Sequence, residues 1–269
     1  MRSEHSRLGG ATADVAVEGG AIRVETLGSG PALLLVHGWT LDRRIWEAQA
    51  EALAGRFRVI AFDRRGFGQS SAPPDLAREP DDIAAITDFL GLERFALIGM
   101  SQGARIALAF AIRHPGRVSA LVLQGAPLSG LPDAEEALPL DAMAALAADG
   151  QLDAMRRLWR IHALMRVEGA QANARLDAIA ADYVARDLIV PGGSLPVTVE
   201  DLVHVRAPVL AITGAQEPAS RRRAADILAE ATGGARLDIP GGSHLCNLSE
   251  AEAYNAALVG FLETALCAA

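Results

Sequence analysis

The stretch GMSQG at residues 99–103 sets one hydroxyl, that of Ser101, between two glycines. The apolar run RFALIGM ends there, and QGARIALAF, whose apolar residues recur at helical spacing, begins. A serine on a sharp turn between a buried strand and a helix has its hydroxyl pushed out above the sheet, while flanking glycines permit close backbone approach. The pattern therefore predicts a nucleophilic serine and not a bystander in a small-residue loop.

A serine hydroxyl needs a base to take its proton, and histidine suits this task because its ordinary pKa of about 6.5 lies near neutral pH. Of the six histidines, His244 follows the last predicted strand, in the small-residue loop IPGGSHLCNL. We expect that loop at the edge of the sheet where Ser101 emerges, so His244 is the predicted base. The other histidines lie in the N-terminal segment, in a strand-end loop before the serine, at a helix end, or in a long insert and its exit: His5, His37, His114, His162 and His204.

The third group of such a site is a carboxylate, which accepts the second imidazole N–H, fixes the ring tautomer and stabilises the imidazolium. Glu217, in AITGAQEPAS, comes just after a predicted strand that lies between Ser101 and His244 in the chain. We therefore predict Glu217 as the orienting carboxylate. There are three rival carboxylates. Asp63 precedes the serine and is expected to tie down its own arginine-rich loop, whereas Asp201 and Asp238 fall before or within predicted strands.

Attack on a carbonyl also needs backbone N–H donors placed where the negative oxygen forms. One donor is expected from the residue after the nucleophile, Gln102. The second is expected from the loop after the first buried strand, where VHGW contains Trp39. The sequence thus predicts an oxyanion hole made by the backbone N–H groups of Trp39 and Gln102. The indole of Trp39 can pack at the same time, because the donor is its backbone.

The elements that must position these groups alternate between short apolar runs and helical stretches. Runs as solidly apolar as PALLLVHG are typical of strands buried on both faces, and an opening hairpin over 13–28 turns at its paired glycines. The alternation predicts an α/β fold with a mostly parallel central sheet and helices on both faces. The predicted buried strands are PALLLVHG, FRVIAFD, RFALIGM, VSALVLQG, APVLAITG and ARLDIP, and the predicted helices span 46–54, 80–90, 102–114, 221–231 and 250–266.

One connection is far longer than the others. About 80 residues separate VLQGAP from APVLAITG, whereas a strand-to-helix loop usually has about 2–6. We predict a core domain over 1–127 and 206–269 and an inserted helical cap over 128–205. Within the insert, QLDAMRRLWRIHALMRV places Trp159, His162 and Met165 on one helical face. They are candidates for lining a substrate pocket, although such a face can also be plain core.

Composition excludes several classes of function. The net charge of −8, with no basic block longer than two residues apart from the three arginines at 221–223, disfavours nucleic-acid binding. No apolar run approaches the roughly 20 residues that a membrane span needs, and the N-terminal segment lacks the apolar stretch of a secretory signal. A soluble, cytoplasmic protein is expected. Cys246 and Cys267 lack neighbours at ligand spacing, so neither a metal nor a disulfide is predicted. No oligomeric state is predicted.

The motifs together resemble the α/β-hydrolase family. They are HGW (37–39), DRRGFGQS (63–70), GMSQG (99–103), HPGRV (114–118), GAQEP (214–218) and SHLCNL (243–248). The resemblance extends over nearly the whole chain except the cap. The resemblance implies a nucleophile-elbow hydrolase that acts through an acyl-enzyme on a triad of Ser101, Glu217 and His244, with no cofactor. The C-terminal third is most similar to 3-oxoadipate enol-lactonases and related carboxylesterases, whereas HGWTLDRRIW resembles esterases and cofactor-free haloperoxidases. Glu217 stands where aspartate is commoner in the family.

The function predicted from these residues is hydrolysis of a small carboxylic ester or lactone. C–C bond hydrolysis and perhydrolase or haloperoxidase chemistry would use the same residues, and a catalytically weak ligand-binding sensor is a further alternative. Dehalogenase and epoxide hydrolase chemistry need a carboxylate nucleophile, which Ser101 is not. Three arginines could pair with the carboxylate of an anionic lactone, or could form ion pairs within their loops: Arg64, Arg65 and Arg105.

Overall fold

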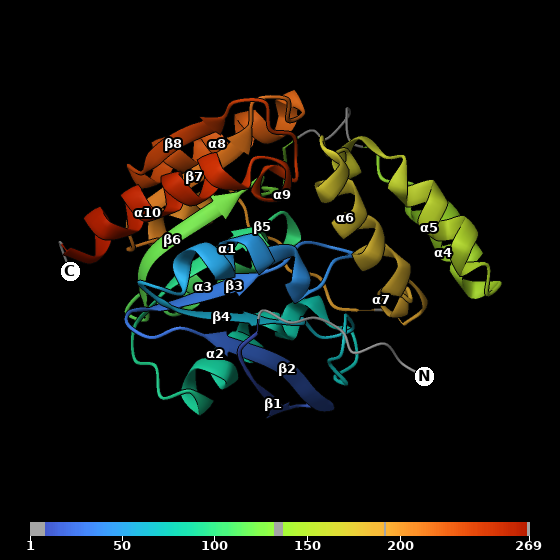
Figure 1. Ribbon diagram of the computed structural model, residues 1–269, viewed down its shortest axis with the longest axis horizontal. Helices are drawn as coiled ribbons and strands as arrows, with labels where there is room; N and C mark the ends of the chain where they lie inside the picture. The colour runs from blue at the N-terminus through green and yellow to red at the C-terminus, as the bar shows by residue number, and fades with distance from the viewer. Residues whose placement is uncertain (1–8, 132–136, 191, 268–269) are drawn as a thin grey trace.

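An eight-stranded sheet forms the centre of the computed structural model, which describes residues 9–131, 137–190 and 192–267 (Figure 1). The strand order is β1-β2-β4-β3-β5-β6-β7-β8. β1 pairs antiparallel with β2 and β2 with β4, and every later pair is parallel. The strands are β1 Ala11–Val17, β2 Gly20–Leu27, β3 Ala32–Val36, β4 Arg58–Phe62, β5 Phe95–Met100, β6 Val118–Gln124, β7 Val209–Gly214 and β8 Ala235–Ile239.

Burial follows the predicted pattern in the middle of the sheet and departs from it at one edge. Every residue of β3, β5, β6 and β7 is buried, as expected for strands covered on both faces. β8, which was expected to be equally buried, has one buried residue out of five. The reason is its position, because an edge strand has only one neighbour to cover its sides.

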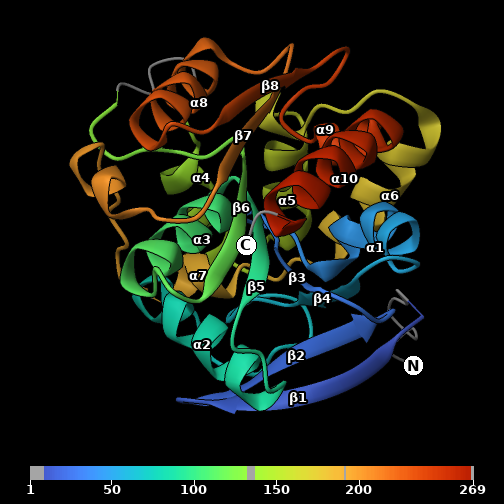
Figure 2. The ribbon, with the colours of Figure 1, turned by 90° about the vertical axis from the view of Figure 1, so that its left-hand side faces the viewer.

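Helices cover both faces of the sheet, and each face has its own apolar core. α1 (Glu47–Leu53) and α10 (Ala251–Cys267) pack against side chains such as Leu33 and Leu35. α2 (Glu79–Phe89), α3 (Gln102–Arg113) and α8 (Ala219–Thr232) pack on the alternate residues, such as Leu34 and Val36. Figure 2 shows the two groups on opposite sides of the sheet. The alternation in β3 thus divides the molecule into two cores.

The insert, by which we mean the described residues between β6 and β7, is helical. Its helices between residues 140 and 189 lie beyond the ends of the central strands, at the right of Figure 1, and contribute to the same core cluster as α1 and α10. Its last part, with Leu195, Val197 and Leu202, contributes instead to the core shared with α3 and α8. The domain boundaries predicted for the cap stay a prediction. The elements of the insert are α4 Leu140–Ala148, α5 Leu152–Arg160, η3 Ala163–Met165, α6 Ala170–Asp182, α7 Arg186–Ile189 and η4 Glu200–His204.

Shorter elements complete the chain and bear on the predicted exclusions. They are η1 Arg43–Trp46, η2 Leu76–Arg78 and α9 Cys246–Ser249. In the part of the chain that the structure describes, no helix has the length and apolarity to cross a membrane. Over the same residues no group of three His, Cys, Asp or Glu side chains is arranged to hold a metal ion. The cytoplasmic location and the lack of a cofactor, metal or nucleic-acid partner stay predictions.

Helix α3 lies unusually close to the backbone of β3, and a glycine makes this possible. A Cβ atom on Gly103 would lie 2.3 Å from the carbonyl oxygen of Val36 and 2.4 Å from that of His37. No side chain fits at such distances unless the helix moves away from the sheet. The packing of α3, and with it the turn that carries Ser101, therefore depends on the absence of a side chain at Gly103.

We expect Gly103→Ala to lower the free energy of unfolding by about 1–3 kcal/mol, the usual cost of overpacking a tight contact. Gly260→Ala in α10 is the matched control, because a Cβ atom on Gly260 would meet nothing within 4 Å and alanine in a helix interior adds about 0.5–1 kcal/mol. Urea unfolding of both variants measures the difference. A Gly103→Ala protein as stable as the wild type would contradict the packing argument.

Candidate active site

Ser101 lies on the turn between β5 and α3 in a strained backbone conformation. Its φ is 53° and its ψ is −123°, in the region that residues with a side chain rarely adopt. Its N–H donates to the carbonyl oxygen of Gln124 at 2.7 Å, and its own carbonyl oxygen accepts from the N–H of Ala104 at 2.9 Å. Backbone contacts thus hold the residue on both sides, while its side chain lines a cavity.

His244 and Glu217 form a buried pair beside that cavity. His244 Nδ1 is hydrogen-bonded to Glu217 Oε1, and the two residues are 4% and 3% exposed. The other carboxylate oxygen accepts from the N–H of Gly214 at 3.3 Å, at the end of β7. A carboxylate facing Nδ1 keeps the proton on that nitrogen and leaves Nε2 as the proton acceptor. His244 lines the same cavity as Ser101, so the structure brings all three predicted residues to one place.

Gln124, the last residue of β6, connects the serine turn with the histidine loop and was not predicted from the sequence. Its carbonyl oxygen accepts from Ser101, and its side-chain amide donates to the carbonyl oxygen of His244 at 2.9 Å and to Asn247 Oδ1 at 3.0 Å. It is fully buried. The sequence contains one signal of this role, because Gln124 is a long polar residue at the end of the apolar run VSALVLQ.

The predicted oxyanion donors flank the serine. Gly38, Trp39 and Gln102 all line the cavity. Gln102 is the first residue of α3, and N–H groups of a first helical turn have no acceptor within the helix. Its N–H is therefore suited to an incoming oxygen atom. The role of both N–H groups stays a prediction.

The cavity itself has a volume of about 410 Å³. Two of the three insert residues predicted to line it do so, Trp159 and Met165. His162 is not among the lining residues: α5 ends at Arg160, so His162 lies beyond the helix whose face it was predicted to share, and its ring stacks on Trp159 at 4.8 Å between ring centroids. The other side chains and backbones that line it are mostly apolar: Gly38, Trp39, Leu41, Met100, Ser101, Gln102, Arg105, Pro127, Leu138, Leu140, Leu164, Asp187, Leu188, Arg221, His244 and Leu245.

Comparison with known proteins now identifies the family. A family model described as the alpha/beta hydrolase fold matches residues 31–251. This chain belongs to the α/β-hydrolase fold family. The predicted family and fold class are therefore confirmed, and the chain is an enzyme of the hydrolase class.

Two relatives and one solved structure show what this chain is similar to. The putative carbamate hydrolase RutD of Caulobacter sp. strain K31 is 33% identical over 235 residues, which are 81% of this chain and 85% of that protein. A pimeloyl-[acyl-carrier protein] methyl ester esterase of Chromobacterium violaceum is 30% identical over 259 residues, 90% of this chain and 98% of its own. The enol-lactonase of Burkholderia xenovorans LB400 has a TM-score of 0.78 at 23% identity, covering 93% of this chain and all of that one (100%), a likeness of fold.

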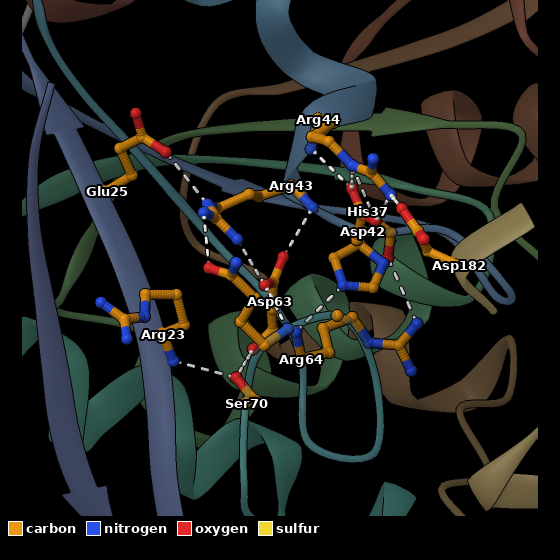
Figure 3. A network of polar contacts seen from close by, with 12 residues as sticks. Arg23, Glu25, His37, Asp42, Arg43, Arg44, Asp63, Arg64, Ser70 and Asp182 are labelled. Carbon is orange, nitrogen blue, oxygen red and sulfur yellow. Dashed lines mark hydrogen bonds and ion pairs between the residues drawn. The ribbon is translucent and has the colours of Figure 1, made fainter. Parts of the chain in front are cut away.

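In this α/β-hydrolase the loop after β4 carries two buried arginines, and Figure 3 shows one of them, Arg64, beside His37 in the loop after β3. Arg64 donates to both carboxylate oxygens of Glu79 at 2.6 and 2.8 Å, and to Gln102 Oε1 at 2.6 Å. Arg65 donates to both oxygens of Asp82, at 2.6 Å each. Both arginines are thus engaged in ion pairs with α2, the alternative that the sequence left beside substrate binding. Arg105, the third candidate, lines the cavity.

Asp63 links the loop after β4, in which it lies, to Arg43 in the segment after β3. It accepts from the backbone N–H of Gln69 at 2.8 Å and of Arg43 at 2.9 Å, and from the Arg43 guanidinium at 2.5 Å. Glu25 holds the same guanidinium from the other side at 3.0 Å (Figure 3). Burial raises the pKa of the Asp63 carboxyl to about 6, although Arg43 opposes the shift. The expected structural role of Asp63 agrees with these contacts.

His37 is a neutral residue that contacts the loop after β4. Its Nε2 accepts from the N–H of Arg64 at 2.9 Å, and its Nδ1 lies 2.8 Å from the carbonyl oxygen of Gly38. Phe67 meets the ring edge-on, with 5.6 Å between ring centroids. Burial, and after it the charge of Arg64, lowers the pKa of His37 well below its usual value. His37 is thus fixed in the tautomer that accepts from Arg64.

This shift predicts a pH dependence of stability. Below about pH 6.5 the unfolded chain binds a proton on His37 that the folded chain does not bind, so the free energy of unfolding falls by about 1.4 kcal/mol per pH unit. We expect His37→Gln to be less stable near neutral pH but to lose less stability than the wild type on acidification to about pH 5. Urea unfolding at several pH values gives the two slopes.

The exposed His204 supplies the control. His204→Gln is expected to follow the wild-type slope, whereas equal slopes for His37→Gln and the wild type would show that His37 titrates normally in the folded protein. Asp63, whose raised pKa contributes with the opposite sign below about pH 6, is present in every variant and cancels in the comparison.

Proposed function

We propose that this hydrolase cleaves a small carboxylic ester or lactone through an acyl-enzyme on Ser101. The observation that carries the proposal is the buried His244–Glu217 hydrogen bond on the wall of the cavity that Ser101 also lines. A carboxylate, an imidazole and a strained serine in this relation form the arrangement that activates a hydroxyl. Each comes from a different loop, after β5, β7 and β8.

The proposed reaction has two halves. Ser101 Oγ attacks the carbonyl carbon and gives its proton to His244 Nε2, while Glu217 stabilises the imidazolium. The carbonyl oxygen becomes negative and accepts from the N–H groups of Trp39 and Gln102. The intermediate collapses when His244 returns the proton to the leaving alkoxide. A water molecule, deprotonated by His244, then attacks the acyl-enzyme and releases the acid and the free serine.

The cavity supports a small, largely apolar substrate. A volume of about 410 Å³ lies at the lower end of the range for small-molecule sites, about 300–1,000 Å³. We propose that residues 128–205 act as a cap over it, with Trp159 and Met165 in contact with the substrate. The similar proteins named as a carbamate hydrolase and a methyl ester esterase would both act at a carbonyl carbon that bears a heteroatom leaving group, which fits this reaction.

Covalent labelling tests the proposal directly. The purified protein and Ser101→Ala are incubated with a fluorophosphonate and weighed by intact-mass spectrometry, then assayed on p-nitrophenyl esters, a lactone, a p-nitrophenyl carbamate, a diketone acid and hydrogen peroxide. We expect one adduct on the wild type alone, with ester or lactone turnover. No adduct and no turnover would favour the ligand-binding sensor, whereas labelling with turnover only of a diketone acid or peroxide would favour the C–C hydrolase or perhydrolase.

Replacing the orienting carboxylate separates its role from that of the fold. We expect Glu217→Gln to fold normally and to lower kcat by about 10³–10⁴, because an amide at this position no longer stabilises the imidazolium or fixes its tautomer. Glu230→Gln, on the exposed side of α8, is the matched control and should leave kcat unchanged. Turnover near the wild-type rate in Glu217→Gln would send the search for the carboxylate back to Asp201 or the insert.

A further inference from the structure

Asp187 is a carboxylate on the cavity wall that the proposed reaction does not use. It lies in α7 of the insert and lines the cavity. Its Oδ2 accepts from the indole N–H of Trp39 at 2.5 Å, and its Oδ1 accepts from the hydroxyl of Tyr183 at 2.8 Å. Both carboxylate oxygens therefore have a donor within the protein. One of those donors belongs to the residue whose backbone N–H is proposed to bind the oxyanion.

The backbone is strained on both sides of this contact. In the described ranges, the residues other than glycine with a positive φ are Thr40 at 61°, Ser101 at 53° and Ala185 at 56°. Thr40 directly follows Trp39, and Ala185 precedes α7. Strained residues persist where the surrounding structure determines them strongly, and they gather at functional sites. Two strained positions thus flank the Trp39–Asp187 hydrogen bond, and the third is the nucleophile.

A second contact fixes the same loop to the insert. The indole N–H of Trp159 donates to Thr40 Oγ1 at 2.7 Å. The rings of Trp39 and Trp159 meet edge-on at 4.9 Å between centroids. The insert therefore holds two consecutive residues of the loop after β3, one through an acceptor on α7 and one through a donor on α5.

Tyr183 keeps Asp187 in place. Its ring is buried and stacks on Phe67, with 6.2 Å between centroids and 12° between planes. Burial and the neighbouring Asp187 raise the pKa of its hydroxyl, so the hydroxyl keeps its proton and donates. A carboxylate with both oxygens occupied offers little to a substrate cation. The contacts assign it the role of an acceptor for Trp39.

We propose that Asp187 is a positioning residue for the oxyanion hole. By accepting from the indole N–H of Trp39, it orients the backbone N–H of the same residue toward the oxyanion, and this orientation requires α7 to be packed against the loop after β3. The inference rests on the proposed function and adds to it a part for the insert beyond roofing the cavity. It acts on the transition state, because the oxyanion forms only there.

Steady-state kinetics on p-nitrophenyl butyrate test this role. We expect Asp187→Ala to lower kcat about 10- to 100-fold with little change in KM, since a displaced donor loses much of its transition-state stabilisation. Asp187→Asn should stay within about threefold of the wild type, because its amide oxygen can accept from Trp39 while its NH₂ donates to Tyr183. Asp149→Ala, at an exposed position of the insert, is the control and should not change kcat.

A double-mutant cycle identifies the partner. Trp39→Phe keeps the backbone N–H and removes the indole donor, so we expect it to lower kcat about as much as Asp187→Ala, with the double variant no worse than either. Circular dichroism and thermal unfolding exclude a loss of fold.

Several outcomes would overturn the inference. They are an unchanged kcat in Asp187→Ala, a change in KM alone, equal losses in Asp187→Asn and Asp187→Ala, which would indicate a role for the charge, and additive losses in the cycle. In each of these the wild type still reacts with the fluorophosphonate, which distinguishes them from failure of the proposed function. A wild type that neither reacts nor turns over the ester overturns both.

Discussion

The left-handed backbone of Ser101 is the constraint on which the rest of the site depends. A serine does not adopt a φ of 53° unless its neighbours hold it there, and here the carbonyl oxygen of Gln124 on β6 and the first turn of α3 do so. Beside that turn α3 packs against the backbone at the end of β3, where Gly103 leaves no room for a side chain. The same Gln124 also holds the carbonyl oxygen of His244. A single strand end thus fixes both the nucleophile and the base.

Buried ion pairs hold the loops after β3 and β4 in place, as the end of β6 holds the serine. Arg43, Arg64 and Arg65 are each at most 3% exposed and each face a carboxylate. Such pairs cost much desolvation and contribute little net stability, but removing one partner is strongly unfavourable. Here they link the loop after β3 to β2 and the loop after β4 to α2. Arg64 extends this order to Gln102 beside the serine.

The sequence predicted those features of the fold and the site that depend on local patterns of residues. The strands of the central sheet, the turn at Ser101 and the order of Glu217 and His244 follow from runs of a few residues, and the structure places those groups together. Gln124 and Asp187 were missed because their roles depend on contacts between distant segments, 148 residues apart for Trp39 and Asp187. Helical spacing predicted that Trp159, His162 and Met165 share one helical face, but α5 ends at Arg160, so His162 and Met165 lie beyond the helix and only Trp159 and Met165 line the cavity. The exposure of β8 depends on strand order, which no local pattern contains.

The insert leaves and rejoins the sheet at β6 and β7, which are adjacent and parallel. An insertion whose two ends meet at neighbouring strands can be lengthened, shortened or exchanged without altering the sheet, and this makes it the natural place for substrate preference to diverge among related hydrolases. The hydrogen bond between Trp39 and Asp187 limits that freedom. A replacement segment that reshapes the cavity must also bring an acceptor to the indole of Trp39. The evolution of specificity in this chain is therefore tied to one hydrogen bond between the insert and the loop after β3.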